Sequence, residues 1–255
     1  MKAIVLVAGY AVRLYPLTEN KPKGLLKLGD KTLLDYLFEK LERVEAVDEA
    51  ILISNNKFYN QFCEWSQNYN GRIKTKVLND YTNSNEDRLG AIGDMQYVID
   101  KCKIDDEIMV LVSDNYFDFE LSDFYDFYKE KNTDCILGTE FKDKEKIRNR
   151  FGVAVLDEND KVVNMVEKPS NPPSNFVVFA SYIYTKDTVR MIKQYLQEGN
   201  NKDAPGNFPS WLYSKKPVHA FRFEGECYDI GTIESYNELN ERFKERSING
   251  LSSTL

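Results

Sequence analysis

Two basic residues follow a short small-residue loop near the N-terminus, and their types suit the binding of phosphate. The apolar run 3–7 ends in a turn that contains Gly9, with Arg13 after the turn and Lys23 ten residues later. Backbone N–H groups of such a loop form a concavity that attracts anions. The segment is neither a Walker A loop nor a Gly-x-Gly-x-x-Gly fingerprint. The alternative is a plain strand–loop connection with two solvated basic side chains.

A carboxylate lies at the end of another buried segment. Asp114 follows the apolar run 108–112 and one serine, Ser113. A carboxylate at the C-terminal edge of a strand is well placed to hold Mg²⁺, and the alternative is an ordinary turn aspartate. Because ligands of open α/β sheets bind outside the carboxyl ends of the strands, we expect Asp114 and the loop after residue 7 to lie at the same edge.

The elements that must position these residues alternate through the first half of the chain. Periodicity predicts strands at 2–7, 50–54, 73–78 and 108–112, and helices at 32–43, 57–69, 91–101 and 122–131. This alternation is typical of an α/β protein with a Rossmann-like, mostly parallel sheet covered by helices on both faces.

The second half of the chain is richer in strands. We expect strands at 135–141, 153–156, 162–166, 176–184 and 218–223, and helices at 185–196, 208–213 and 233–246. These patterns predict a single domain over residues 1–246, with a β-rich insertion over about 132–232 after a first portion of about 1–131. The small, polar residues 247–255 are expected to fray.

Several motifs, in order along the chain, resemble those of the sugar-1-phosphate nucleotidyltransferases, with glucose-1-phosphate thymidylyltransferases as the nearest type. The family opens with Leu-Ala-Gly-Gly-x-Gly-Thr-Arg-Leu-x-Pro-Leu-Thr and then Pro-Lys. Here residues 6–18 read LVAGYAVRLYPLT, followed by Pro22 and Lys23. The later landmarks are SDN at 113–115, FGV at 151–153, EKP at 167–169 and CYDIGT at 227–232. The resemblance covers roughly residues 1–240.

This resemblance implies a role for each matching residue. The phosphate-handling catalytic residues would be Arg13, Lys23 and Lys168, and the Mg²⁺ ligands Asp114 and Asp229. Lys168 would bind the sugar phosphate, with Glu167 and the Gly152 amide contacting sugar hydroxyls. The nucleotide would contact Ala8, Gly9, Tyr10, Ala11, Val12, Arg13, Lys23, Asn79, Arg88, Leu89 and Gly90.

The implied reaction joins a nucleoside triphosphate to a sugar-1-phosphate and releases pyrophosphate by one in-line displacement. Three positions depart from the family's loop: Ala8 and Ala11 replace glycines, and Val12 replaces a threonine. An alanine at position 11 would be strained if the backbone there has positive φ. A cytidylyltransferase acting on a polyol phosphate or phosphocholine stays open, as does a non-catalytic nucleotide-sugar sensor. A glycosyltransferase with a metal-binding Asp-x-Asp motif is less favoured, because Ser113-Asp114-Asn115 lacks the second aspartate.

Composition narrows the classes of partner and compartment. The chain has 255 residues and a net charge of −7, which argues against a general nucleic-acid binder. No apolar run approaches the ~20 residues of a membrane helix. Four scattered cysteines without a Cys-x-x-Cys motif predict a reduced, cytoplasmic protein, and a homo-oligomer stays open. The one histidine, His219, excludes His-rich zinc sites and makes a covalent nucleotidyl-histidine unexpected.

Overall fold

Four parallel strands form one side of the sheet in a computed structural model that describes residues 1–248. They are β1 (Lys2–Leu6), β4 (Glu49–Ser54), β5 (Lys74–Asn79) and β6 (Ile108–Val112), in the order β6-β1-β4-β5. The crossovers carry α1 (Leu33–Leu41), α2 (Tyr59–Asn68) and α3 (Ala91–Cys102). In register, Leu6 pairs with both Ile53 and Val112. The loops after these strands therefore begin at one edge of the sheet.

Strand β11 (Phe176–Tyr184) joins the second half of the chain to this parallel sheet. It pairs antiparallel with β6, with β8 (Asp134–Glu140) and with β9 (Gly152–Leu156). Strand β10 (Val162–Val166) extends β9, and β12 (Val218–Arg222) runs parallel to β8. The remaining helices are α4 (Leu121–Lys131), α5 (Lys186–Gln197), α6 (Asn207–Leu212) and α7 (Ile233–Ile248). One continuous sheet thus carries both halves of the chain.

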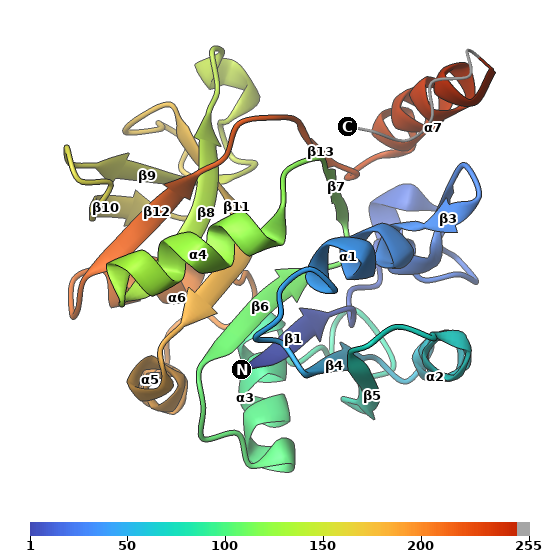
Figure 1. The fold of residues 1–255 in the computed structure, drawn as a ribbon, viewed down its shortest axis with the longest axis horizontal. Coiled ribbons are helices and arrows are strands. Elements are labelled where there is room, and N and C mark those ends of the chain that lie inside the picture. The colour runs from blue at the N-terminus through green and yellow to red at the C-terminus, as the bar shows by residue number, and fades with distance from the viewer. Residues whose placement is uncertain (249–255) are drawn as a thin grey trace.

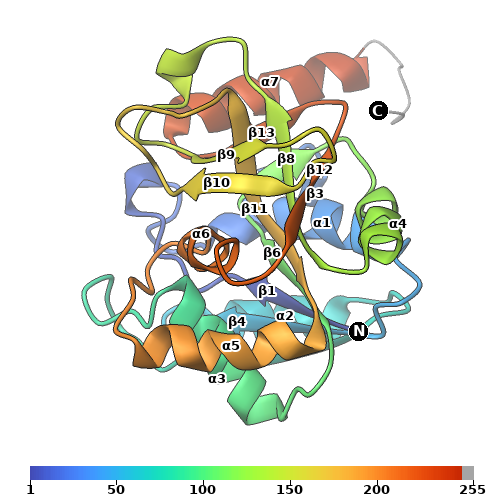
Figure 2. The ribbon, with the colours of Figure 1, turned by 90° about the vertical axis from the view of Figure 1, so that its left-hand side faces the viewer.

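Helices cover both faces of the sheet, and each face has its own hydrophobic core. The first core includes Leu37 of α1, Phe62 of α2 and Phe124 of α4. The second includes Met95 of α3 and Ile192 of α5. Figures 1 and 2 show α4 and α5 on opposite sides of β6 and β11. Burial of these side chains, at about 25 cal/mol per Å² of apolar surface, is the main force that holds the layers together.

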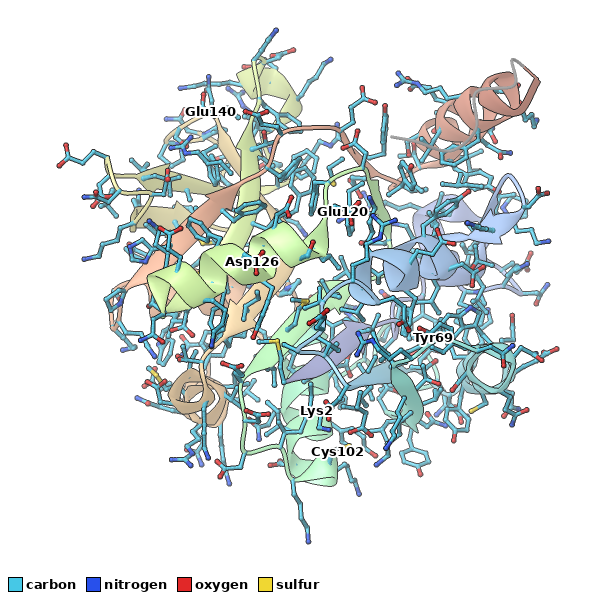
Figure 3. All side chains as sticks on the ribbon, in the orientation of Figure 1. Lys2, Tyr69, Cys102, Glu120, Asp126 and Glu140 are labelled. Carbon is cyan, nitrogen blue, oxygen red and sulfur yellow. The ribbon has the colours of Figure 1, made fainter. Side chains whose placement is uncertain are left out.

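Polar contacts set the start of α1 and link this helix to α4. Thr32 and Asp35 form a capping box, in which the Asp35 N–H donates to Thr32 Oγ1 (3.1 Å) and the Thr32 N–H to Asp35 Oδ2 (2.7 Å). Glu120, labelled in Figure 3, precedes α4 and forms 2.7 Å ion pairs with Lys40 and Arg43 at the end of α1. These contacts hold the helices beside the edge at which β6 ends.

The α/β fold is the one expected from the sequence, and each expected element lies within two residues of its predicted bounds. The patterns missed two short antiparallel strand pairs, β2–β3 (Lys27–Leu28 with Lys31–Thr32) and β7–β13 (Asn115–Phe117 with Cys227–Asp229). Strands this short contain too few residues to show an alternation. The last helix, expected over about 233–246, runs to Ile248. The rest of the expected frayed tail, 249–255, lies outside the described residues.

Candidate active site

The loop after β1 presents a row of free backbone donors. It leads into a single 3₁₀ turn, η1 (Val12–Leu14). The N–H groups of residues 9–13 donate no hydrogen bond to any group within residues 1–248. Ala11, at the start of the turn, has φ of 47° and ψ of 41°, a left-handed conformation that is unfavourable for alanine. Consecutive free amides of this kind are suited to bind the oxygens of a polyphosphate.

Two buried side chains hold the loop in this shape. The Asn55 amide donates to the Ala8 carbonyl (2.8 Å), and the Thr18 hydroxyl donates to the Ala11 carbonyl (2.8 Å). Both side chains are fully buried. Sequence reasoning missed them as site residues. The available signal for Asn55 was its place directly after β4, at the same sheet edge as the loop.

Lys23 and Asp114 meet at the next part of the site. Lys23 begins the turn η2 (Lys23–Leu25), and its Nζ lies 3.1 Å from Asp114 Oδ2. Gly24 allows this approach, because a Cβ at that position would lie 2.6 Å from Ser113 Oγ. The structure therefore places the expected phosphate-binding lysine against the expected metal-binding carboxylate.

The β7–β13 pair brings Asp229 to the same place. Asp229 pairs with Asn115, and the Ile230 N–H donates to the Asp114 carbonyl (3.3 Å). Burial raises the pKa of Asp229, and the charge of Asp114 raises it further. Among the described residues the Asp229 carboxylate accepts no hydrogen bond, and Arg150 Nη2 lies 3.9 Å away.

The donor set at Asp114 and Asp229 fits a divalent cation. Two neighbouring carboxylates repel one another, and a cation such as Mg²⁺, which prefers oxygen ligands, relieves that repulsion. No group of three or more His, Cys, Asp or Glu side chains suited to a metal occurs within residues 1–248. A cation held here would therefore need further oxygen ligands from a substrate or from water.

Lys168 reaches the pocket from the second half of the chain. It follows β10 in a left-handed conformation (φ 47°), and its N–H donates to the Phe151 carbonyl (3.2 Å). Its ammonium is about half exposed and lies 3.8 Å from Glu167 Oε1. Glu167 is largely buried against Gly152 and Gly206, and burial raises the pKa of its carboxyl. These features leave the Lys168 ammonium available to a ligand.

The start of α3 is joined to the loop that precedes α6. Arg88 forms two hydrogen bonds to the Asp203 carboxylate, at 3.0 and 2.6 Å. The Ala91 and Ile92 N–H groups donate to the carbonyls of Asp203 (3.1 Å) and Lys202 (3.0 Å). Gly90 has φ of 82°, and a Cβ there would lie 2.6 Å from the Lys202 carbonyl oxygen. The two halves of the chain therefore meet at this point.

These segments enclose a pocket of about 470 Å³. Most of the expected site residues line it: Ala8, Gly9, Tyr10, Ala11, Val12, Arg13, Lys23, Arg88, Gly90, Asp114 and Lys168. Five do not line it: Asn79, Leu89, Gly152, Glu167 and Asp229. Asn79, the last residue of β5, instead donates a hydrogen bond to Asn56 (2.8 Å) in the loop after β4. The lining also contains Asn85, Asp94, Asp203, Ala204, Pro205 and Gly231, which sequence reasoning did not name as site residues.

Two features that bear on the alternatives raised by the sequence, a membrane-spanning helix and a histidine in the pocket lining, are not found within residues 1–248. None of the helices within residues 1–248 is both long and apolar enough to cross a membrane. His219 lies in β12, pairs in register with Cys135 and is not part of the pocket lining. The pocket chemistry therefore rests on lysine, arginine and carboxylate groups.

Comparison with known proteins agrees with this geometry. The sequence profile described as "Nucleotidyl transferase" matches residues 2–246. The UTP–glucose-1-phosphate uridylyltransferase AglF of Haloferax volcanii is 28% identical over 250 residues, which cover 97% of this chain and 98% of that protein. The bifunctional protein GlmU of Methanocaldococcus jannaschii is 28% identical over 242 residues, 94% of this chain and 54% of that protein.

The fold has a counterpart among solved structures. A crystal structure of a UDP-glucose pyrophosphorylase complexed with UDP-glucose superposes with a TM-score of 0.82 at 19% identity, over 96% of this chain and 98% of that one. The family match over residues 2–246 favours an enzyme over a non-catalytic sensor. The chain belongs to the nucleotidyl transferase family and is a sugar-1-phosphate nucleotidyltransferase.

Proposed function

We propose that this pocket transfers a nucleotidyl group from a nucleoside triphosphate to a sugar-1-phosphate in a single in-line displacement. A phosphate oxygen of the sugar-1-phosphate forms the new bond to the α-phosphorus, and the bond from the α-phosphorus to the bridging oxygen of the β-phosphate breaks. Pyrophosphate leaves with that electron pair. The products are a nucleotide sugar and pyrophosphate.

The row of free N–H groups over residues 9–13, beside Arg13 and Lys23, is the observation that carries this proposal. These groups would bind the triphosphate and neutralise the charge that develops on the leaving pyrophosphate. Lys168, from the other half of the chain, would hold the incoming sugar phosphate in line. Catalysis would consist of positioning and charge neutralisation, without a protein nucleophile.

Asp114 and Asp229 would hold Mg²⁺, as their donor set allows. The bound cation would supply positive charge to the phosphate oxygens. Lys23, 3.1 Å from Asp114, would keep its ammonium beside the same phosphates. Both carboxylates would thus act on the substrate through their place at the ends of β6 and β13.

A substrate matrix tests the proposal. The purified enzyme with Mg²⁺ is incubated with ATP, CTP, GTP, UTP or dTTP against glucose-, mannose- and N-acetylglucosamine-1-phosphate, with ribitol phosphate and phosphocholine as further acceptors. Pyrophosphate release is measured. We expect release with at least one sugar-1-phosphate. Release of pyrophosphate only with ribitol phosphate or phosphocholine, or no release with any of the acceptors, would contradict the proposal.

A labelling experiment tests the single displacement. The enzyme is incubated with α-labelled triphosphate and Mg²⁺ but without a sugar phosphate, and is then denatured. We expect no label to stay on the protein, because the only histidine lies outside the pocket and protonated lysines are poor nucleophiles. Stoichiometric label on the denatured chain would show a two-step path.

A further inference from the structure

Arg150 brings a positive charge to the carboxylate of Asp229. Its Nη2 lies 3.9 Å from Asp229 Oδ2, and this is the one ion pair that Arg150 forms within residues 1–248. Its guanidinium also lies over the ring of Phe151, 5.2 Å from the ring centroid. Arg150 is not part of the pocket lining, so its charge acts on the site through Asp229.

The backbone on both sides of Arg150 is held in place. Arg150 lies in the loop between β8 and β9, in which Ile147 is fully buried in the first core. The Arg150 N–H donates to the Ile147 carbonyl (3.0 Å), and the Asn149 N–H donates to the Pro169 carbonyl (3.0 Å). The Phe151 carbonyl accepts a hydrogen bond from the backbone of the segment that follows β10. The position of Arg150 is therefore fixed by the fold, and the reach of its side chain includes Asp229.

The carboxylate of Asp229 is open to competition between cations. The positive charges that act on it are, in decreasing order, those of Lys23, Arg150 and Arg13. Lys23 is already engaged by Asp114, at 3.1 Å. Arg150 has no other anionic partner within residues 1–248. A divalent cation that binds Asp229 must therefore meet the Arg150 charge at the same carboxylate.

Two cations that share one carboxylate repel one another, and solvent limits the size of this repulsion. A divalent cation carries twice the charge of the guanidinium, so the repulsion stays measurable even in surroundings close to water. The Arg150 side chain is 56% exposed and that of Asp229 is 30% exposed, so water and salt screen the two charges. The physics therefore predicts a change in metal affinity of about three- to tenfold rather than of several orders of magnitude.

We propose that Arg150 competes with the divalent cation for the Asp229 carboxylate and so limits the affinity of the site for the metal. This inference rests on the proposed function, because it concerns the cation that Asp114 and Asp229 would hold there. Arg150 acts through Asp229, so it tunes the metal site and is not a catalytic residue.

The test is a titration of the substrate-free enzyme with the metal alone. Wild type, Arg150→Gln and Arg150→Lys are titrated with Mn²⁺, and free Mn²⁺ is read by electron paramagnetic resonance. The matched control is Arg148→Gln, which removes the same charge from the same loop, where Arg148 pairs with Glu145 at 3.2 Å. Asp229→Asn, alone and combined with Arg150→Gln, completes a cycle that isolates the coupling between Arg150 and Asp229.

We expect Arg150→Gln to bind Mn²⁺ about three- to tenfold more tightly than wild type does. Arg150→Lys keeps the charge and should bind Mn²⁺ within about twofold of wild type, as should the control Arg148→Gln. In the Asp229→Asn background, Arg150→Gln should raise the affinity no more than the control does, because the shared carboxylate is gone. A purely structural role for Arg150 would not produce a gain in affinity that a lysine reverses.

Unchanged or weaker Mn²⁺ binding in Arg150→Gln would overturn the proposal. An equal gain in Arg148→Gln or in Arg150→Lys, or a gain of the same size without the Asp229 carboxylate, would also overturn it. Failure of both wild type and Arg150→Gln to bind Mn²⁺ would do the same. The expected coupling, found in an enzyme that releases no pyrophosphate in the substrate matrix, would leave this inference standing while the proposed function fails.

Discussion

At the scale of single residues, the pocket separates two kinds of phosphate contact. Arg13 follows the free amides of the η1 loop, whereas Lys168 follows β10 in the other half of the chain. Within residues 1–248, the Arg13 side chain makes no hydrogen bond or ion pair, and the Lys168 ammonium forms one ion pair, with Glu167 at 3.8 Å. Both cations are therefore free to meet different substrates.

We expect Arg13→Ala mainly to raise KM for the triphosphate and Lys168→Ala mainly to raise KM for the sugar phosphate. Each substitution removes one charge-assisted hydrogen bond, worth about 1.5–3 kcal/mol or roughly 10- to 150-fold. Initial rates with one substrate varied and the other saturating give both constants. The control is the surface variant Arg190→Ala. Arg190 lies on α5 and forms an ion pair with Asp105. Equal rises for both substrates in both variants would contradict the assignment.

Ala11 gives a second prediction, on stability. An alanine at φ 47° pays a cost that glycine avoids. We expect Ala11→Gly to raise the free energy of unfolding by up to about 1 kcal/mol, because relief of strain exceeds the added chain entropy. Urea denaturation measures the change. The control is Ala204→Gly, at a pocket position with ordinary backbone, which should lose stability.

The third prediction concerns pH. The pKa of Asp94 is raised to about 8 in the folded enzyme, against about 3.9 in an unfolded chain. The folded state therefore binds this proton more tightly, and the associated stability is full below about pH 4 and is lost as pH rises towards 8. The free energy of unfolding, measured by urea denaturation, should fall less between pH 5 and pH 8 for Asp94→Asn than for wild type. Equal falls for the two proteins would contradict this.

Much of the site could be read from residue types and spacing, and the rest could not for physical reasons. Gly9 and Asp114 each come two residues after a predicted strand, so the strand ends place them, and Arg13 and Lys23 follow Gly9 in the sequence. Asp94 lies inside a helix, where its spacing suggests only an ordinary polar position. Asp203 lies in a loop whose fold depends on contacts with α3 far away in the sequence. Such long-range contacts leave no local pattern.

At the scale of elements, α7 packs from outside the sheet against the segment around η1, which follows the loop after β1. Leu239 of α7 packs in a small cluster with Leu14, Leu26 and Ile230. The Tyr236 hydroxyl also donates to the Lys27 carbonyl (2.7 Å). Figures 1 and 2 show α7 near the rim that β7 and β13 form. The helix was predictable from its periodicity, but its partner was not, because β2 and β13 are too short to detect.

We expect Leu239→Ala to cost about 2–4 kcal/mol of stability and also to weaken triphosphate binding, because it leaves a cavity beside Leu14. Denaturation and calorimetric titration measure the two effects. The matched control is Leu121→Ala in α4, which is equally buried but packs in the core that does not contain Leu14. The control should lose stability and keep its affinity for the triphosphate. Loss of affinity in both variants would contradict a specific role for α7.

At the scale of the whole molecule, both substrate-binding halves rest on one hydrogen-bonded sheet. Strand β11 pairs with β6 of the first half and with β8 and β9 of the second. The halves therefore cannot rotate as separate bodies without breaking that sheet. We expect small-angle scattering to give the same radius of gyration, within about 0.5 Å, with and without substrates, because a domain of this size has no hinge between its halves. A larger decrease would show domain closure.

The contacts of the α3 N-terminus make the two walls of the pocket differ in their free backbone amides. A helix start usually offers its free amides to anions, but here the Ala91 and Ile92 amides are engaged by the carbonyls of Lys202 and Asp203. The positive end of α3 is thus neutralised by the protein, and the unengaged amides belong to the opposite wall. A nucleotide that entered tail first would bring its phosphates to a wall whose helix amides are already engaged and whose Arg88 is already paired with Asp203. The free donors of the η1 wall therefore favour one orientation of the incoming molecule.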